Sequence, residues 1–196
     1  MSATDQTPAW LTAALERMPM PDIPATELWD FSAAALLKPR LPPGTRWLAG
    51  KLDGFGAVRF SARAIGIDST GPIRWTDIIE IHTQPPLDAM TGAAKDTVIT
   101  TLTRMLPVGR GMSARVLDEM VEVVLGMLRR AERDSVVPYE FVYRAWLRRR
   151  TLTPGLVSAA VLALPQVAAS VLATAAANGV ARSTVARSTK ENQRPS

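Results

Sequence analysis

The feature that most constrains this chain is a run of 26 residues, Leu156–Ala181, that contains no charged side chain. A continuous helix of that length would cross about 30 Å of hydrocarbon. Many of its residues are alanine, and Pro165-Gln166 lies near its middle, which favours one or two helices bent at the proline and packed on the protein. Because arginines adjoin both ends of the run, we expect membrane association, with packed helices as the alternative.

Three alanines of this run, Ala169, Ala173 and Ala177, fall on one helical stripe. A ridge of small side chains lets a second helix approach closely, so two copies of the chain could form a homodimer here. The residues expected to face a membrane or a partner helix are Trp146, Leu156, Val161, Leu164, Ala169, Ala173 and Ala177.

Aromatic and arginine side chains interleave just before this run. The spacing of Tyr139, Val142, Tyr143 and Trp146 predicts a helix over Pro138–Arg150 with one aromatic stripe. A stripe of this kind is typical of a helix that faces the core, but it does not account for three consecutive arginines. Rings beside guanidinium groups suit anionic lipid or nucleic acid. The expected anion- or lipid-binding residues here are Arg144, Arg148, Arg149 and Arg150.

The charge distribution agrees with this placement. Residues 104–196 hold 14 of the 23 cations and 7 of the 18 anions, so any attraction for polyanions lies in that half. Gly109-Arg110-Gly111 precedes a predicted helix over Ser113–Arg133, where Arg110 and Arg115 could help backbone N–H groups to hold a phosphate. The alternative is a flexible turn with Ser113 as the helix N-cap.

The middle of the chain changes to a strand pattern. Short strands are expected at Arg46–Ala49, Ala57–Ser61, Ala64–Asp68, Ile73–Trp75 and Ile78–Thr83, with a turn at Asp68-Ser69-Thr70-Gly71. Thr97–Leu106 could add another strand. Alternation places Trp75, Ile79 and Ile81 on one face, and Ile78, Glu80 and His82 on the other.

Residues 64–82 contain a strand, a glycine-bearing turn, a strand ending in Trp75 and then Asp-Ile-Ile-Glu-Ile. This pattern resembles the hairpin of bacterial pleckstrin-homology-like domains. The resemblance covers residues 45–133 and implies a tryptophan beneath the sheet, with Ser113–Arg133 as the helix that closes one end of a barrel. It also implies a scaffold that binds lipid head groups or peptides, without catalytic residues.

Composition excludes several chemistries. Without cysteine there is no disulfide scaffold, thiol catalysis or cysteine-ligated metal, and one histidine excludes a two-histidine metal centre. His82 would need an orienting carboxylate to act in catalysis, and Glu80 is its candidate partner. The alternative is an exposed strand residue. The acidic groups Asp118, Glu119 and Glu122 lack an apolar pocket, so we interpret them as solvated. No metal or cofactor is expected.

The sequence therefore predicts an α+β protein with a small antiparallel sheet or partial barrel closed by a long helix. Residues 1–44 would form helices at Pro8–Met18 and Thr26–Leu37 and a proline-rich linker, 45–133 the sheet unit, 138–181 a helical module, and 182–196 a disordered basic tail. No secretory signal pattern is visible, so we expect a cytoplasmic location. The predicted function is a non-enzymatic adaptor at the inner face of the cell membrane, bound to anionic lipid or a membrane protein. The alternative is a nucleic-acid-binding protein.

Overall fold

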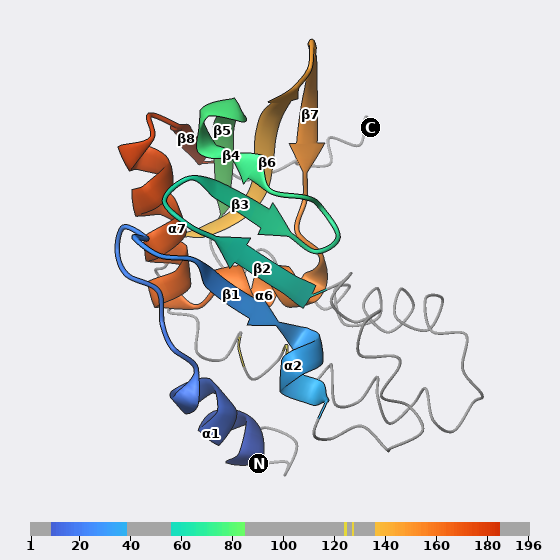
Figure 1. Cartoon of the computed structure of the whole chain (residues 1–196), viewed down its shortest axis with the longest axis vertical. Coiled ribbons are helices and arrows are strands. Elements are labelled where there is room, and N and C mark those ends of the chain that lie inside the picture. Colours follow the sequence, from blue (N-terminus) through green and yellow to red (C-terminus); the bar gives the residue numbers. More distant parts are fainter. Residues whose placement is uncertain (1–8, 39–55, 85–123, 125–126, 128–135, 185–196) are drawn as a thin grey trace, which may run out of the picture.

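The protein is an α+β structure built on two open four-stranded sheets (Figure 1). The computed structural model describes residues 9–38, 56–84 and 136–184, together with Val124 and Met127, which are helical and buried. The α+β class is confirmed, whereas the described strands form two sheets that do not close into a barrel. A single apolar core draws on both sheets and on the helices packed against them.

The first sheet has the order β1-β2-β3-β4 and is antiparallel throughout. The strands β2 (Ala57–Phe60), β3 (Ala64–Ile67) and β4 (Ile73–Arg74) follow the predicted pattern closely. The β3–β4 turn begins at Asp68, whose φ of 54° is in the left-handed region, which aspartate tolerates better than most residues. The 3-10 turn η3 (Trp75–Asp77) then carries the chain into the second sheet, and it buries Trp75 beside the first.

The predicted helix over Thr26–Leu37 is wrong. Its middle forms β1 (Trp29–Ser32), which pairs with β2, and only α2 (Ala33–Leu37) is helical. Alternation explains the strand, because Trp29 and Phe31 point into the core while Asp30 points out. Ser32 ends the strand and caps α2, since its Oγ accepts a hydrogen bond from the Ala35 N–H at 2.9 Å. The expected first helix is confirmed as α1 (Ala9–Arg17).

The second sheet has the order β7-β6-β5-β8. It joins β5 (Ile78–Gln84) to β6 (Val137–Ala145) and β7 (Arg148–Leu152) in antiparallel pairs, and to β8 (Ala181–Thr184) in a parallel pair. The predicted helix over Pro138–Arg150 is therefore wrong. Its aromatic and β-branched residues have high strand propensity, and pairing with β5 on one side and β7 on the other decides their conformation.

The start of the expected disordered tail is also wrong. Residues Ala181–Thr184 form β8, although their side chains are mostly exposed and show no apolar alternation. Backbone pairing to β5 holds this strand, supported by the hydroxyl of the fully buried Thr83, which donates to the Ser183 carbonyl oxygen at 3.2 Å. A strand held in this way leaves almost no mark in the hydrophobic pattern.

The charge-free run forms two helices, α6 (Leu156–Leu162) and α7 (Pro165–Ala177), and not one. Pro165 starts α7 because it lacks an N–H group and fits the first turn of a helix. In the described part of the chain no helix has the length and apolar character to span a bilayer. The alternative of packed helices bent at the proline is the one observed.

The polar residues of α7 explain how it packs. Gln166 donates to the Pro21 carbonyl oxygen at 3.2 Å, Ser170 donates to the Asp22 carbonyl oxygen, and Thr174 Oγ1 accepts from the Ala25 N–H at 2.9 Å. The spacing of four residues places all three on one side of the helix, facing the N-terminal segment. The buried hydroxyl groups of Ser170 and Thr174 therefore have partners inside the protein, and the exposed Gln166 adds a contact at the surface.

Several predictions fall outside the described residues. They are the strands at Arg46–Ala49 and Thr97–Leu106, the phosphate-binding residues Arg110 and Arg115, the linker at 39–44, the tail beyond 184, and the helix Ser113–Arg133 apart from Val124 and Met127.

Candidate functional site

The β6–β7 hairpin carries the most unusual surface of the described structure. It projects beyond the rest of the ribbon (Figure 1). The chain turns at Trp146 and Leu147. Their side chains are 97% and 100% exposed, although both belong to residue types that are usually at least partly buried. The two exposed apolar groups lie side by side at the end of the hairpin.

The four arginines of the hairpin divide between its two faces. Arg144 lies directly opposite Arg149 in the strand ladder, whereas Arg148 lies opposite Ala145 and Arg150 opposite Tyr143. Since opposite residues share a face and neighbours alternate, Arg144 and Arg149 are on one face, and Arg148 and Arg150 are on the other. All four are exposed. The tip is therefore apolar and its flanks are cationic on both sides.

Trp146 reaches this exposed position in an unfavourable backbone conformation. Its φ is 56°, in the left-handed region that a bulky residue avoids. Glycine or asparagine would occupy this place in the turn with less strain. Backbone outliers of this kind cluster at functional sites, which makes this exposed tryptophan a candidate functional residue.

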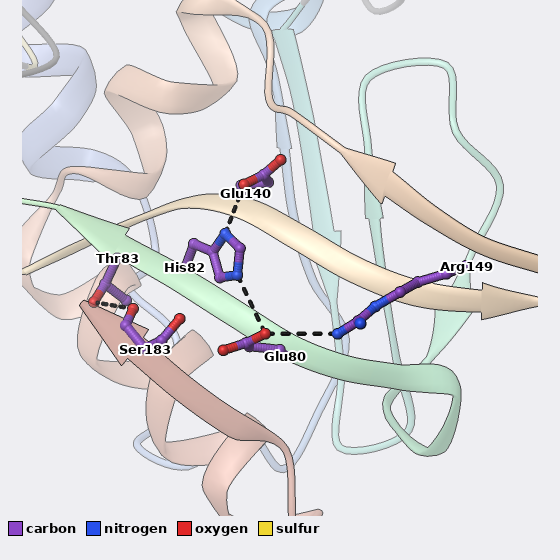
Figure 2. A network of polar contacts seen from close by, with 6 residues as sticks. All are labelled: Glu80, His82, Thr83, Glu140, Arg149 and Ser183. Atoms are coloured by element: carbon purple, nitrogen blue, oxygen red, sulfur yellow. Dashed lines mark hydrogen bonds and ion pairs between the residues drawn. The ribbon is translucent and has the colours of Figure 1, made fainter. Parts of the chain in front are cut away.

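A network of charged side chains lies on the same sheet and extends from His82 through Glu80 to Arg149 (Figure 2). His82 Nδ1 is 2.6 Å from Glu140 Oε2, and its Nε2 is 3.3 Å from Glu80 Oε2. The same Glu80 oxygen is 3.7 Å from Arg149 Nη2. The register explains the first contact, because His82 and Glu140 are directly paired between β5 and β6.

The network shifts the pKa values of two of its members. Burial by itself lowers the pKa of His82, but hydrogen bonds and charge from Glu140 and Glu80 outweigh it, so the pKa is raised above its ordinary value of 6.5. The pKa of Glu80 is lowered, first by a hydrogen bond from the Ser183 side chain and then by His82 and Arg149. Both shifts favour an imidazolium held between two carboxylates.

This arrangement does not suit catalysis or metal binding. An imidazolium bonded through both nitrogens has no lone pair with which to accept a proton from a substrate. The two carboxylates contact opposite nitrogens of the ring, so the three groups do not converge on one point. No metal-binding group of histidine and acidic residues occurs among the described residues. The network is best described as a structural clamp between β5 and β6 that also reaches Arg149.

A separate groove of about 540 Å³ opens on the first sheet. Its walls come from β2, β3 and the turn that follows Asp68, with the exposed side chain of Leu28 at its border. Arg59, which also lines it, is paired with Asp30 at 3.0 Å. Apart from Leu28, its lining residues lie within the region of the pleckstrin-homology-like resemblance.

The structure brings some of the predicted site residues together and separates others. Arg144, Trp146 and Arg148–Arg150 meet on one hairpin, although as strands and not as a helix. Val161 and Leu164 are buried in the protein's own core, and Leu156 is the first residue of α6. On α7, Ala169 and Ala177 are exposed and Ala173 is half-buried, so the alanine ridge lies at the surface.

The sequence pattern pairs His82 with Glu80, but nothing in it points to Leu147, Glu140 or Ser183. Glu140 and Ser183 reach His82 and Glu80 through strand pairing across 58 or more residues, for which a single sequence carries no local signal. Leu147 was recognisable only as the neighbour of Trp146. No protein-family model, curated protein or solved structure matches this chain.

Proposed function

We propose that this protein is a non-enzymatic adaptor that docks on the anionic, cytoplasmic face of a membrane through the tip of its β6–β7 hairpin. The observation that carries the proposal is the fully exposed Trp146–Leu147 pair between four exposed arginines. Tryptophan favours the interfacial region of a bilayer, and leucine favours the hydrocarbon below it. The apolar tip and the cationic flanks therefore match the two layers of one surface.

The energetics support reversible docking. A basic side chain close to an anionic membrane contributes about 1 kcal/mol to the binding free energy. All four arginines lie within three residues of Trp146 or Leu147. Insertion of the two apolar side chains adds to this attraction without a spanning helix. The groove on the first sheet would hold the adaptor's second ligand, a peptide or a lipid head group, as the pleckstrin-homology-like resemblance implies.

The fully exposed Leu147 favours a membrane over nucleic acid. Nucleic-acid binding would use the arginines for phosphates and an aromatic ring for stacking, but it gives an exposed leucine at the tip no partner. A lipid surface gives all of these groups a partner. Nucleic acid is therefore an outcome that the experiment must separate.

The experiment measures sedimentation of the full chain with phosphatidylcholine vesicles, with and without phosphatidylglycerol. We expect binding to the anionic vesicles, with a blue shift of tryptophan emission as Trp146 leaves water. The tip variant W146S/L147S should lose most of this binding, whereas the control R63A/R74A, which removes two exposed arginines of the first sheet, should keep it.

Two outcomes would overturn the proposal. One is a wild-type protein that binds neither kind of vesicle. The other is a tip variant that binds as well as the wild type. Tight binding of an oligonucleotide that weakens steeply with salt and survives the tip substitution would support the nucleic-acid alternative instead.

A further inference from the structure

Arg144 and Arg149 form a pair of like charges held in register. Their Cα atoms are partners in the β6–β7 ladder, so both side chains leave the same face of a two-stranded ribbon at one level. Like charges directly opposite each other destabilise a sheet. An anion shared between the two guanidinium groups would offset this repulsion, and phosphate suits the geometry because each guanidinium can donate two hydrogen bonds to it.

Glu80 partly supplies that anion. Its Oε2 is 3.7 Å from Arg149 Nη2, too long for a hydrogen bond but within reach of an ion pair. The same oxygen is closer to His82, at 3.3 Å, and the Ser183 side chain also donates to this carboxylate. Arg149 is therefore the most weakly held of the groups around Glu80, and its side chain is 63% exposed. A stronger anion in front of the hairpin would displace it from Glu80.

The distance from the tip places the arginine pair at the correct depth. Arg144 and Arg149 are each two residues from the tip residues Trp146 and Leu147, which corresponds to about 7 Å along a strand. An inserted apolar group reaches roughly 5–10 Å into the boundary between head groups and acyl chains. When the tip is inserted, Arg144 and Arg149 lie at the level of the lipid phosphates.

We propose that Arg144 and Arg149 together bind the phosphate group of an anionic membrane lipid, and that Glu80 competes with this phosphate for Arg149. The inference rests on the membrane docking proposed above and adds to it a specific pair of ligand residues and an internal competitor. It separates Arg149 from Arg150, the next residue, which leaves the opposite face and has no role in this site.

The first experiment compares two variants that each remove one carboxylate from His82, E80Q and E140Q. Both change the net charge equally, but only Glu80 contacts Arg149. We expect E80Q to bind vesicles that contain phosphatidylglycerol about 1.5- to 5-fold more tightly than the wild type, the range that a surface ion pair allows. E140Q should bind like the wild type.

The second experiment compares R149A with R150A, which remove one cation each from neighbouring positions of β7. R149A should weaken binding to the anionic vesicles more than R150A does, and E80Q/R149A should bind like R149A, because the competitor acts only through Arg149. Inorganic phosphate at matched ionic strength should compete poorly with the vesicles, because it offers no apolar layer into which Trp146 and Leu147 can insert.

The outcomes separate this inference from the docking proposal. If the wild type binds and W146S/L147S does not, but E80Q equals E140Q or R149A equals R150A, the phosphate pair is wrong and the docking stands. If inorganic phosphate at matched ionic strength abolishes vesicle binding, the site binds free phosphate and not lipid, and this result also overturns the inference. Circular dichroism of each variant verifies that the fold is retained.

Discussion

The carboxylate of Asp68 accepts a hydrogen bond from the hydroxyl group of Ser158, a contact that joins the turn of the first sheet to the first turn of α6. Its second oxygen accepts from the Gly155 N–H at 2.8 Å, so one side chain from another element caps this helix. Burial raises the pKa of Asp68, against the lowering effect of its hydrogen bonds. The carboxylate thus exchanges contact with water for contact with the helix terminus.

We expect D68A to lower the free energy of unfolding by about 1–2 kcal/mol, because it leaves the start of α6 without its cap. The matched variant D68N keeps an acceptor for Ser158 and tolerates the left-handed φ of this position, so it should lose less. Urea denaturation of the three proteins measures the difference. Equal loss in both variants would show that the charge, and not the acceptor, holds the helix.

The clamp around His82 makes stability depend on pH. The pKa of His82 is raised in the folded protein, so below the unfolded value of about 6.5 the imidazolium stabilises the fold fully. This contribution is lost as the pH rises through the folded pKa. Stability should therefore fall between these two pKa values. For Glu80 the pKa is lowered, so its contribution is lost only as pH falls below its ordinary value of 4.5.

Proton NMR measures the His82 titration directly, because this is the only histidine of the chain. We expect a midpoint above 6.5 in the wild type and a lower midpoint in E140Q, which loses the carboxylate 2.6 Å from Nδ1. A wild-type midpoint at or below 6.5 would mean that burial outweighs the two carboxylates.

Replacement of Trp146 should separate stability from docking. W146G removes a bulky side chain from a left-handed position, so we expect the free energy of unfolding to stay equal or rise by about 0.5 kcal/mol. W146A loses the same ring but keeps a Cβ atom in that conformation, and it should be the less stable of the two. Both variants should lose vesicle binding. A large loss of stability in W146G would show that the ring packs in solution.

Gly56 directly precedes β2 and lies against α2 and α6, and a side chain at this position has no room. A Cβ atom would come within 2.7 Å of the Ala33 Cβ and 2.8 Å of Val157 Cγ1, on α2 and α6. We expect G56A to lower the free energy of unfolding by about 1–3 kcal/mol, the usual cost of overpacking a core. The double variant G56A/V157A makes room for the new methyl group and should recover part of the loss in thermal unfolding.

The local strand signals of this chain were readable, whereas its long-range pairing was not. Strands β2–β4 follow from alternation and from the turn at Asp68, because they are neighbours in both the sequence and the first sheet. Strand β5 follows from its own alternation, although its partners are distant in sequence. By contrast, Tyr139, Val142 and Tyr143 have a helix-like spacing, and only the pairing of β6 with β5 and β7 makes them a strand. The arginines and Trp146 were predicted as a group, and their arrangement came from that pairing.

The charge-free run shows the same limit on another scale. Its composition alone fits either a spanning helix or packed helices, since both bury apolar side chains. What decides is a set of polar partners 145 or more residues away, where Gln166, Ser170 and Thr174 bind the segment around Pro21 and Ala25. These hydroxyl and amide groups were visible in the sequence, but their partners were not.

The position of β5 between β6 and β8 bears on how this protein is made. During synthesis β5 leaves the ribosome long before β6, and β8 follows only with residues 181–184. Until β6 is made, the backbone of Ile78–Gln84 has both edges unpaired, and the edge that pairs with β8 stays open until residues 181–184 follow. The nascent chain therefore exposes an unpaired, aggregation-prone strand edge for about 100 residues of translation. A chaperone that shields this strand would raise the yield of folded protein.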